Sequence, residues 1–285
     1  MPAPARVLAE RCCGPLPRRV WVEQIMGMPV SVHLRGEIAD PAVERAVAGV
    51  FAHLRAIETE LSPWRPDSAL NRLRRAELTL KDAGPRLRQV VRMCEVARER
   101  TGGWFDAFCA PGQGDPPAPD RLDPTGDRRF DPTGLVKGWA VELAAVRLET
   151  LPGVDHCLNA GGDVTVGCSL AGSPDWVIGI EDPADRDRVL LTVPLRHGGI
   201  ATSGTAVRGA HVLSPDTGLP ATQLLSVTVI GPSLTWADVR ATAALAEGPG
   251  CVARLRTLAD HVALVVDSRG ELLRVGPDAD TPSGS

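Results

Sequence analysis

The sequence predicts a single α+β domain in which a mixed β-sheet packs against helices. Apolar positions recur at helical spacing between about residues 40 and 151, whereas short β-branched runs separated by Gly and Pro dominate from about 164 to 275. Helices and strands do not alternate regularly, as they would in a doubly wound parallel sheet. The 285 residues, 44% hydrophobic and 23% charged, can bury one sizeable core.

Two amphipathic helices are expected first along the chain. Asp40 and Pro41 offer an N-cap and a first-turn proline to the first helix. Its apolar stripe consists of Val43, Val47, Val50, Leu54, Ile57 and Leu61. The second helix is stopped by Gly102 and Gly103. Its apolar positions are Leu87, Val90, Val91, Cys94 and Val96.

The remaining elements follow from local composition. Residues 112–129 are rich in Pro, Gly and Asp and predict a surface loop, and a third helix is expected at about 135–151. Further helices are expected at 235–246 and 251–259. Strands are expected at 164–166, 176–180, 189–195 and 225–230, with a closing hairpin formed by 262–266 and 272–275 around Arg269-Gly270.

Composition excludes several classes of protein. The net charge of −4 and the lack of a basic tract argue against nucleic acid or an anionic membrane surface as the main partner. No apolar run approaches the ~20 residues of a spanning helix, so we expect no stable membrane anchor. The first twenty residues lack the apolar stretch of a secretory signal, which predicts a cytoplasmic protein. The seven cysteines are odd in number and contain no CxxC, as expected for reduced thiols.

Asp238 and Thr242 are the first candidate site residues. They lie four positions apart in a predicted helix and therefore share one face. A carboxylate and a hydroxyl so placed suit Mg²⁺, which takes few protein oxygens and leaves its other positions to water, backbone carbonyls and substrate phosphate. The alternative is that Asp238 caps the helix and Thr242 has no special role.

His211 lies directly before the turn at residues 214–218. A histidine at the end of a strand can act as a general base, because its ordinary pKa is near neutrality. A lone histidine can equally be structural. Lys137, one of only two lysines, falls in the first turn of the third helix, just after the Asp-Pro-Thr-Gly turn at 131–134. A helix start with a lysine attracts phosphate, although an ordinary capped helix has the same pattern.

A Gly-Gly turn at 161–162, within LNAGGDV, would let the backbone approach a ligand closely. Trp64 and the pair Trp104-Phe105 could stack on a flat heteroaromatic ring, or could simply belong to the core.

Together and in this order, these segments resemble the FAD:protein FMN transferases of the ApbE family. The matching pieces are Met26-Gly27, LSPWRPDSAL (61–70), TGGWFDAF (101–108), FDPTGLVKGWAVE (130–142), LNAGGDV (158–164), ATSG (201–204), HVLSPDTG (211–218) and SVTVIGPSLTWADVRATA (226–243). The resemblance implies a family domain at 21–276, preceded by a flexible extension at 1–20 and followed by a disordered tail at 277–285.

The resemblance also implies a reaction. Such an enzyme uses Mg²⁺ and FAD, attaches FMN to a Thr or Ser hydroxyl of an acceptor flavoprotein, and releases AMP. Metal ligation is implied for Asp238, Thr242 and the Gly134 carbonyl, and acceptance of the hydroxyl proton for His211. The residues implied to contact FAD are Met26, Trp64, Trp104, Phe105, Asp106, Asp131, Lys137 and Leu213.

Three positions depart from the family pattern. Ser214 replaces an Asp that many relatives have near the histidine, Arg74 replaces the usual Asn, and Trp139 replaces the usual Tyr. Two other functions therefore stay open. One is an FAD pyrophosphatase that transfers FMN to water, and the other is a flavin-binding protein with impaired catalysis.

Overall fold

The computed structural model describes residues 7–8, 16–108, 110–111, 128–205 and 212–277. The helices are α1 (Pro41–Leu61), α2 (Ala69–Arg74), α3 (Pro85–Arg100), α4 (Thr133–Glu149), α5 (Leu234–Glu247) and α6 (Cys251–Leu255), with a 3-10 turn at Gly248–Gly250. The strands are β1 (Val7–Leu8), β2 (Arg18–Ile25), β3 (Met28–Gly36), β4 (Ala110–Pro111), β5 (Arg128–Arg129), β6 (Val154–Ala160), β7 (Asp163–Gly167), β8 (Trp176–Glu181), β9 (Val189–Leu195), β10 (His197–Gly204), β11 (Leu224–Gly231), β12 (Val262–Asp267) and β13 (Leu272–Val275).

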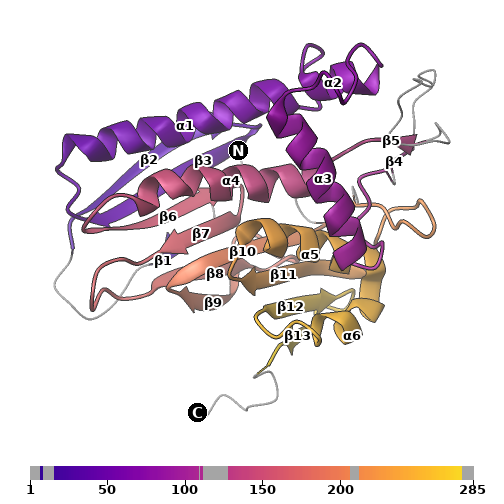
Figure 1. The fold of residues 1–285 in the computed structure, drawn as a ribbon. Coiled ribbons are helices and arrows are strands. Elements are labelled where there is room, and N and C mark those ends of the chain that lie inside the picture. The colour runs from indigo at the N-terminus through magenta and orange to yellow at the C-terminus, as the bar shows by residue number, and fades with distance from the viewer. Residues whose placement is uncertain (1–6, 9–15, 109, 112–127, 206–211, 278–285) are drawn as a thin grey trace.

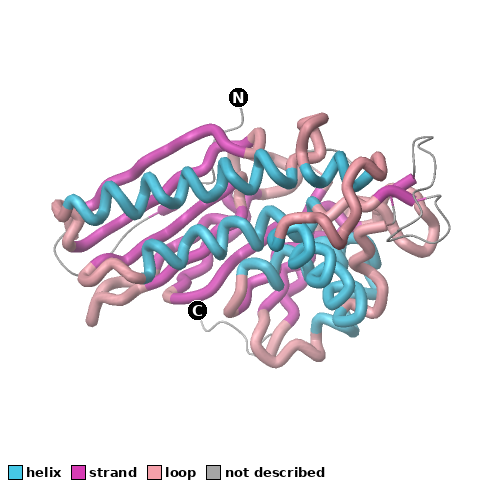
Figure 2. The backbone as a smooth tube through the Cα atoms, turned by 45° about the horizontal axis from the view of Figure 1, so that its top comes forward, coloured by secondary structure: helices cyan, strands magenta, loops and turns pink. Residues whose placement is uncertain are grey.

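Three layers form the fold. The central layer is an eight-stranded sheet in the order β13-β12-β11-β10-β7-β6-β3-β2. Helices α1, α4 and α5 cover one face of this sheet (Figure 1) and run alongside its strands (Figure 2). The smaller sheet β1-β8-β9 supplies apolar side chains that pack with residues of β6, β7, β10 and β12 on the other face. The α+β class is therefore confirmed.

Strand alternation explains how both faces of the central sheet are covered. Leu158 and Ala201 belong to the core beneath the helices, whereas their neighbours Cys157 and Ile200 belong to the core beneath the small sheet. Every described pairing in the large sheet is antiparallel, not mixed as expected. The reason is that the helical connections re-enter the sheet at the end where the chain left it: Gly36 at the end of β3 pairs with Val154 at the start of β6, and Ile230 near the end of β11 pairs with Val262 at the start of β12.

A buried ion pair ties the two sheets together. Arg35 Nε lies 2.9 Å from Asp155 Oδ2, and both side chains are essentially inaccessible to solvent. The Arg35 guanidinium also lies over the ring of Trp176, 4.2 Å from its centroid. Because the pair spans β3 and β6 and touches β8, it fixes how the small sheet sits on the large one.

Local signals placed the helices well. Asp40 caps α1 through a hydrogen bond from the Ala42 amide, and the predicted stripe of α1 is buried. In α3 the stripe continues through Ala97 and leaves Val96 37% exposed, which corrects the expectation for Val96. The helix expected at 251–259 ends at Leu255, and the hairpin β12–β13 forms around Gly270, whose φ is +84°.

Several elements escaped the sequence analysis. Strand β6 carries buried polar residues that interrupt its apolar run, β10 has two glycines directly after its first residue, and α2 is too short to show a period. Strand β2 already begins at Arg18, inside the segment expected to be an extension, and β1 pairs with β8. Of the expected loop at 112–129, residues 112–127 lie outside the described residues and 128–129 form β5.

The four cysteines in the described part of the chain, Cys94, Cys157, Cys168 and Cys251, are free thiols and buried. Burial raises the pKa of each of these thiols. None of the helices that the structure describes combines the length and the hydropathy needed to cross a bilayer.

Candidate active site

A cavity of about 770 Å³ lies at the place in the central sheet where β7 and β10 are no longer paired. Strand β10 pairs with β7 only as far as Ile200, whereas it continues beside β11 to Gly204. The last residues of β10 and the Gly161-Gly162 turn therefore border an opening rather than a continuous sheet. The β2–β3 turn, the C-terminal end of α1, and helices α4 and α5 complete the wall.

This one cavity collects every predicted site residue that the structure describes. They come from separate parts of the chain: Met26, Trp64, Trp104, Phe105, Asp106, Asp131, Gly134, Lys137, Leu213, Asp238 and Thr242. His211 lies outside the described residues. The aromatic residues do not behave alike: Trp64 is 89% exposed at the cavity and is not a core residue, whereas Phe105 is buried.

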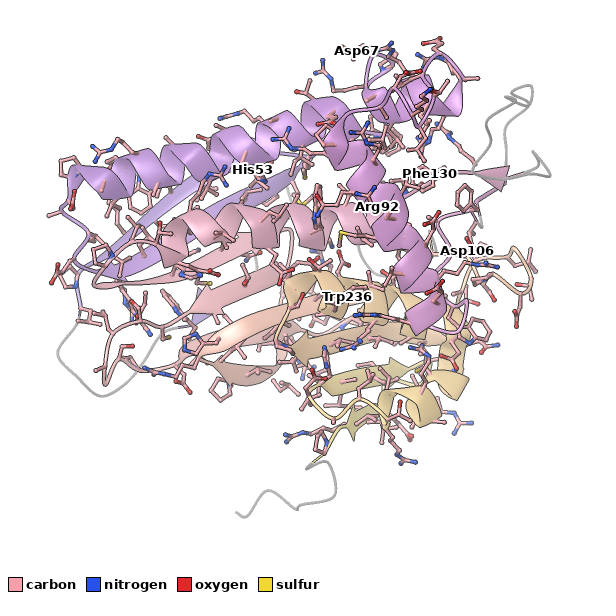
Figure 3. All side chains as sticks on the ribbon, in the orientation of Figure 1. His53, Asp67, Arg92, Asp106, Phe130 and Trp236 are labelled. Atoms are coloured by element: carbon pink, nitrogen blue, oxygen red, sulfur yellow. The ribbon has the colours of Figure 1, made fainter. Side chains whose placement is uncertain are left out.

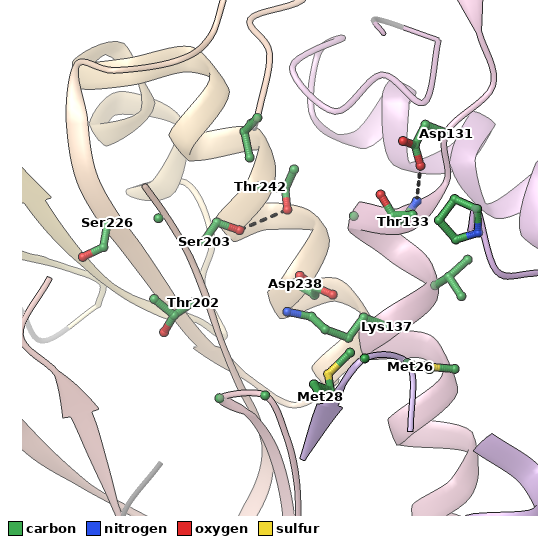
Figure 4. A pocket seen from close by; sticks show the side chains of 18 of the residues that line it. Met26, Met28, Asp131, Thr133, Lys137, Thr202, Ser203, Ser226, Asp238 and Thr242 are labelled. Atoms are coloured by element: carbon green, nitrogen blue, oxygen red, sulfur yellow. Dashed lines mark hydrogen bonds between the residues drawn. The ribbon is translucent and has the colours of Figure 1, made fainter. Parts of the chain in front are cut away.

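Two glycines let α4 approach α5 closely enough to form the floor of the cavity. A Cβ on Gly138 would lie 2.9 Å from the Asp238 Cβ, and a Cβ on Gly134 would lie 3.3 Å from the Thr242 Cγ2. A larger residue at Gly138 would have to displace Asp238 and crowd the Leu234 carbonyl of α5, whereas at Gly134 it would press on the Phe105 and Thr242 side chains. The packing brings Asp238, Thr242 and the backbone of Gly134 together, as Figure 4 shows for the two side chains.

Asp238 does not cap α5, which corrects that alternative. The N-cap is Ser233, whose side chain accepts a hydrogen bond from the Trp236 amide. Asp238 lies one turn further along, only 2% exposed, and its Oδ2 accepts a hydrogen bond of 3.0 Å from the Gly138 amide. Burial, followed by the nearby charge of Asp163, raises the pKa of Asp238 to about 7.

Lys137 reaches from the first turn of α4 toward these carboxylates (Figure 4). Its Nζ lies 2.8 Å from Asp163 Oδ2, and Asp163 is 1% exposed. The local group of Asp163, Asp238 and Lys137 thus carries one more negative charge than positive when both carboxylates are ionised. A further cation would neutralise this buried excess.

The oxygen donors fit Mg²⁺. Asp238 offers a carboxylate, Thr242 a hydroxyl and Gly134 a carbonyl, all hard ligands. The Gly138 amide, whose helical acceptor is the Gly134 carbonyl, donates to Asp238, so that carbonyl keeps acceptor capacity for another partner. Among the described residues, no three His, Cys, Asp or Glu side chains gather to hold a metal by themselves. A site of this composition therefore suits an ion whose other ligands come from water and a phosphate.

Hydrogen bonds hold the side chains around this floor. The Ser203 and Thr242 hydroxyl oxygens are 3.1 Å apart and share a hydrogen bond. Asp131 Oδ1 accepts a 3.1 Å bond from the Thr133 amide, an Asx turn just before α4, whose N-cap Pro132 makes no side-chain cap hydrogen bond. Figure 3 shows Asp106 and Phe130 beside α3. The Asp106 carboxylate accepts a bond from the Phe108 amide and lies 3.4 Å from Arg98 Nε.

Arg74, one of the three positions expected to depart from the family pattern, lies behind Asp131. Its Nε donates a 2.7 Å bond to the Phe130 carbonyl, its Nη1 donates to Asn71, and its Nη2 is 3.6 Å from Asp131 Oδ1. Burial lowers the pKa of Arg74 to about 10, an effect opposed by Asp131. Arg74 thus braces the segment that leads into α4.

The model of the ApbE family matches residues 26–113 and 118–266. The chain belongs to the ApbE family. A protein named FAD:protein FMN transferase from Haemophilus influenzae is 32% identical over 116 residues, which are 36% of this chain and 33% of that protein. The protein of the same name from Klebsiella pneumoniae is 35% identical over 125 residues, which are 40% and 35% of the two chains. The matched region thus spans about a third of these relatives' length.

Solved ApbE structures show the same fold. The ApbE protein of Thermotoga maritima gives a TM-score of 0.74 at 21% identity and covers 91% of this chain and 97% of its own. The flavin transferase ApbE of Vibrio cholerae gives 0.73 at 21% identity, with 92% and 98% covered. The flavinyl transferase ApbE of Pseudomonas stutzeri gives 0.72 at 24% identity, with 96% and 99% covered.

Three residues at the site of this ApbE family member were not singled out from the sequence. Asp163 is the one acidic residue of LNAGGDV, but only the two glycines of that segment were interpreted from the sequence. Ser203 likewise belongs to ATSG, and the sequence predicted no role for it. Glu58 lines the cavity from α1, and no local signal distinguishes it from the other glutamates of that helix.

Proposed function

We propose that this chain is an Mg²⁺-dependent FAD:protein FMN transferase that attaches FMN to a Thr or Ser hydroxyl of an acceptor flavoprotein and releases AMP. The proposal is carried by one observation. The hard oxygens of Gly134, Asp238 and Thr242 and the ammonium group of Lys137 border the same cavity as exposed Trp64. A ligand in which an aromatic ring system is linked to a diphosphate needs an aromatic surface for the ring and a charged, metal-binding surface for the diphosphate. The names of the relatives support the same activity.

In this reaction the acceptor oxygen forms a bond to the phosphorus of the FMN half, and the bond between that phosphorus and the oxygen bridging to AMP breaks. The hydroxyl proton passes to a base, for which we propose His211, and AMP leaves with the bridging oxygen. Phosphoryl transfer of this kind depends mainly on alignment and charge neutralisation. Bound Mg²⁺ would supply charge neutralisation at the diphosphate.

The protein's own groups have separate tasks in the proposal. Lys137 binds a phosphate oxygen, and Asp163 holds its ammonium group at the floor of the cavity. Ser203 holds the Thr242 hydroxyl in place through their shared hydrogen bond, and the Thr242 oxygen would then be available to Mg²⁺. Trp64, Trp104 and Phe105 offer faces and edges for stacking. Met26, Asp106, Asp131 and Leu213 are the further residues that we propose contact FAD.

The test is to incubate the chain with FAD, Mg²⁺ and an acceptor flavoprotein. Flavin fluorescence that stays with the acceptor after denaturation, with one AMP released per flavin attached, is the expected result. Free FMN with AMP and an unlabelled acceptor would instead identify an FAD pyrophosphatase. Intact FAD would identify a flavin-binding protein without this activity.

Two substitutions test the site. Asp238→Asn keeps the size of the side chain and removes its charge, and we expect it to lower transfer at least a hundredfold, in the range of a lost charge-stabilising group (~10²–10³). Asp260→Asn is the matched control, because Asp260 is exposed and lies outside the cavity lining. Equal loss in both variants would contradict the assignment of Asp238.

A further inference from the structure

The hairpin turn between β2 and β3 is strained at Met26. Ile25 pairs with Met28, so the loop has two residues, Met26 and Gly27, with φ of +56° and +71°. Two positive φ values define a type I′ turn, which favours Asn-Gly. A methionine there brings its Cβ close to the following carbonyl oxygen. Something in the surrounding structure must hold it.

Glu58 supplies that restraint. Its Oε1 accepts a 2.8 Å hydrogen bond from the Met26 amide, across 32 residues of sequence. The acceptor is a carboxylate and the bond is only partly exposed, so it is stronger than a bond between neutral groups. Both Glu58 and Met26 line the cavity, so the restrained turn forms part of its wall.

Three other hydrogen bonds between α1 and β2 give a comparison. Glu44 bonds Arg19 and the Trp21 indole nitrogen, and Arg55 bonds Glu23. None of these residues lines the cavity. They join the side chains of the hairpin to the helix, whereas the Glu58 contact acts on the backbone of the one residue of this turn in an unfavourable conformation.

We propose that Glu58 is a positioning residue for the flavin dinucleotide: it fixes the strained turn so that the Met26 side chain is presented to the ligand. This inference rests on the proposed function. The thioether of methionine is polarisable and packs well against aromatic rings, such as the flavin or the adenine. Without Glu58 only the strand pairing restrains the turn, and Met26 must be re-ordered each time the ligand binds.

The first measurement is FAD affinity and turnover. We expect Glu58→Ala to raise the Kd for FAD about tenfold, the scale of one charge-assisted hydrogen bond. Turnover at saturating FAD is expected to stay within twofold of the wild type. Glu58→Gln, which keeps an acceptor oxygen, is expected to recover most of the affinity. The matched control Glu44→Ala removes an acidic contact of α1 with the same hairpin and is expected to leave the Kd unchanged. An unchanged Kd in Glu58→Ala would overturn the proposal.

A double-mutant cycle separates positioning from direct contact. In a Met26→Gly background the turn is relaxed and the side chain absent, so Glu58→Ala is expected to change the Kd by less than twofold. The same tenfold loss in both backgrounds would mean that Glu58 binds the ligand itself and would overturn the proposal.

Hydrogen exchange at the Met26 amide tests the restraint without any ligand. Exchange is expected to be at least tenfold faster in Glu58→Ala than in the wild type, and unchanged in Glu44→Ala. Equal exchange in wild type and Glu58→Ala would overturn the inference. The exchange measurement does not depend on catalytic activity. A wild type that neither binds FAD nor transfers FMN would refute the proposed function, whatever the exchange rate of the Met26 amide.

Discussion

Replacing Asp238 with asparagine is expected to stabilise the metal-free protein at pH 8 while abolishing its response to Mg²⁺. The carboxylate is 2% exposed, and its pKa rises from an ordinary 3.8 to about 7 through burial and the charge of Asp163. Asparagine has the same shape, can still accept the Gly138 N–H through its amide oxygen, and can donate to Asp163. The substitution therefore removes the charge and keeps the packing.

The sign follows from proton linkage. Between about pH 4 and 7 the folded protein retains a proton on Asp238 that the unfolded chain has lost, so the free energy of unfolding falls as the pH rises through this range. A pKa raised from 3.8 to about 7 corresponds to about 4 kcal/mol lost between pH 4 and pH 8. The asparagine side chain of the variant does not titrate, so the variant loses none of this stability.

The assay is urea denaturation of both proteins between pH 4 and 8, with chelator or with Mg²⁺. Without metal, the two proteins are expected to be similarly stable at pH 4 and to differ by up to about 4 kcal/mol at pH 8. Mg²⁺ at ten times its Kd is expected to add about 1.4 kcal/mol to the wild type and nothing to the variant. A variant that is less stable than the wild type at pH 8, or equally stabilised by Mg²⁺, would refute the reasoning.

Two further predictions concern packing. Gly138→Ala places a methyl group 2.9 Å from the Asp238 Cβ, so we expect the free energy of unfolding in urea to fall by about 1–3 kcal/mol and Mg²⁺ binding to weaken. Gly250→Ala, whose Cβ meets nothing closer than 3.7 Å, is the control, and its free energy of unfolding should fall by less than about 0.5 kcal/mol. Arg35→Leu leaves the Asp155 carboxylate buried without its cationic partner and is expected to cost about 3–5 kcal/mol in the same assay, part of it recovered by also replacing Asp155 with asparagine, which removes the charge and can still accept the Ser169 and Leu170 amides. If the double variant is no more stable than the single one, the unpaired Asp155 charge is not the cause of the destabilisation.

The sequence alone determined what depends on near neighbours. The stripe of α1 follows from a 3.6-residue period and its start from the Asp40 cap, so both could be predicted. The shared face of Asp238 and Thr242 follows from their spacing of four residues. The motif order pointed to the family, and with it to eleven of the residues that line the cavity. All of these are properties of short segments.

Only the tertiary structure decided how those segments meet. The Gly138 amide and Asp238 are 100 residues apart, and their contact depends on two glycines that let α4 and α5 approach. The cavity opens because β10 stops pairing with β7 while it still pairs with β11. This depends on strand register, which the glycine-rich sequence of β10 does not predict. The roles of Asp163 and Glu58 arise from partners brought close by folding. The sequence therefore specified the chemical groups, whereas their burial, charge balance and strain came from long-range packing, which local patterns do not encode.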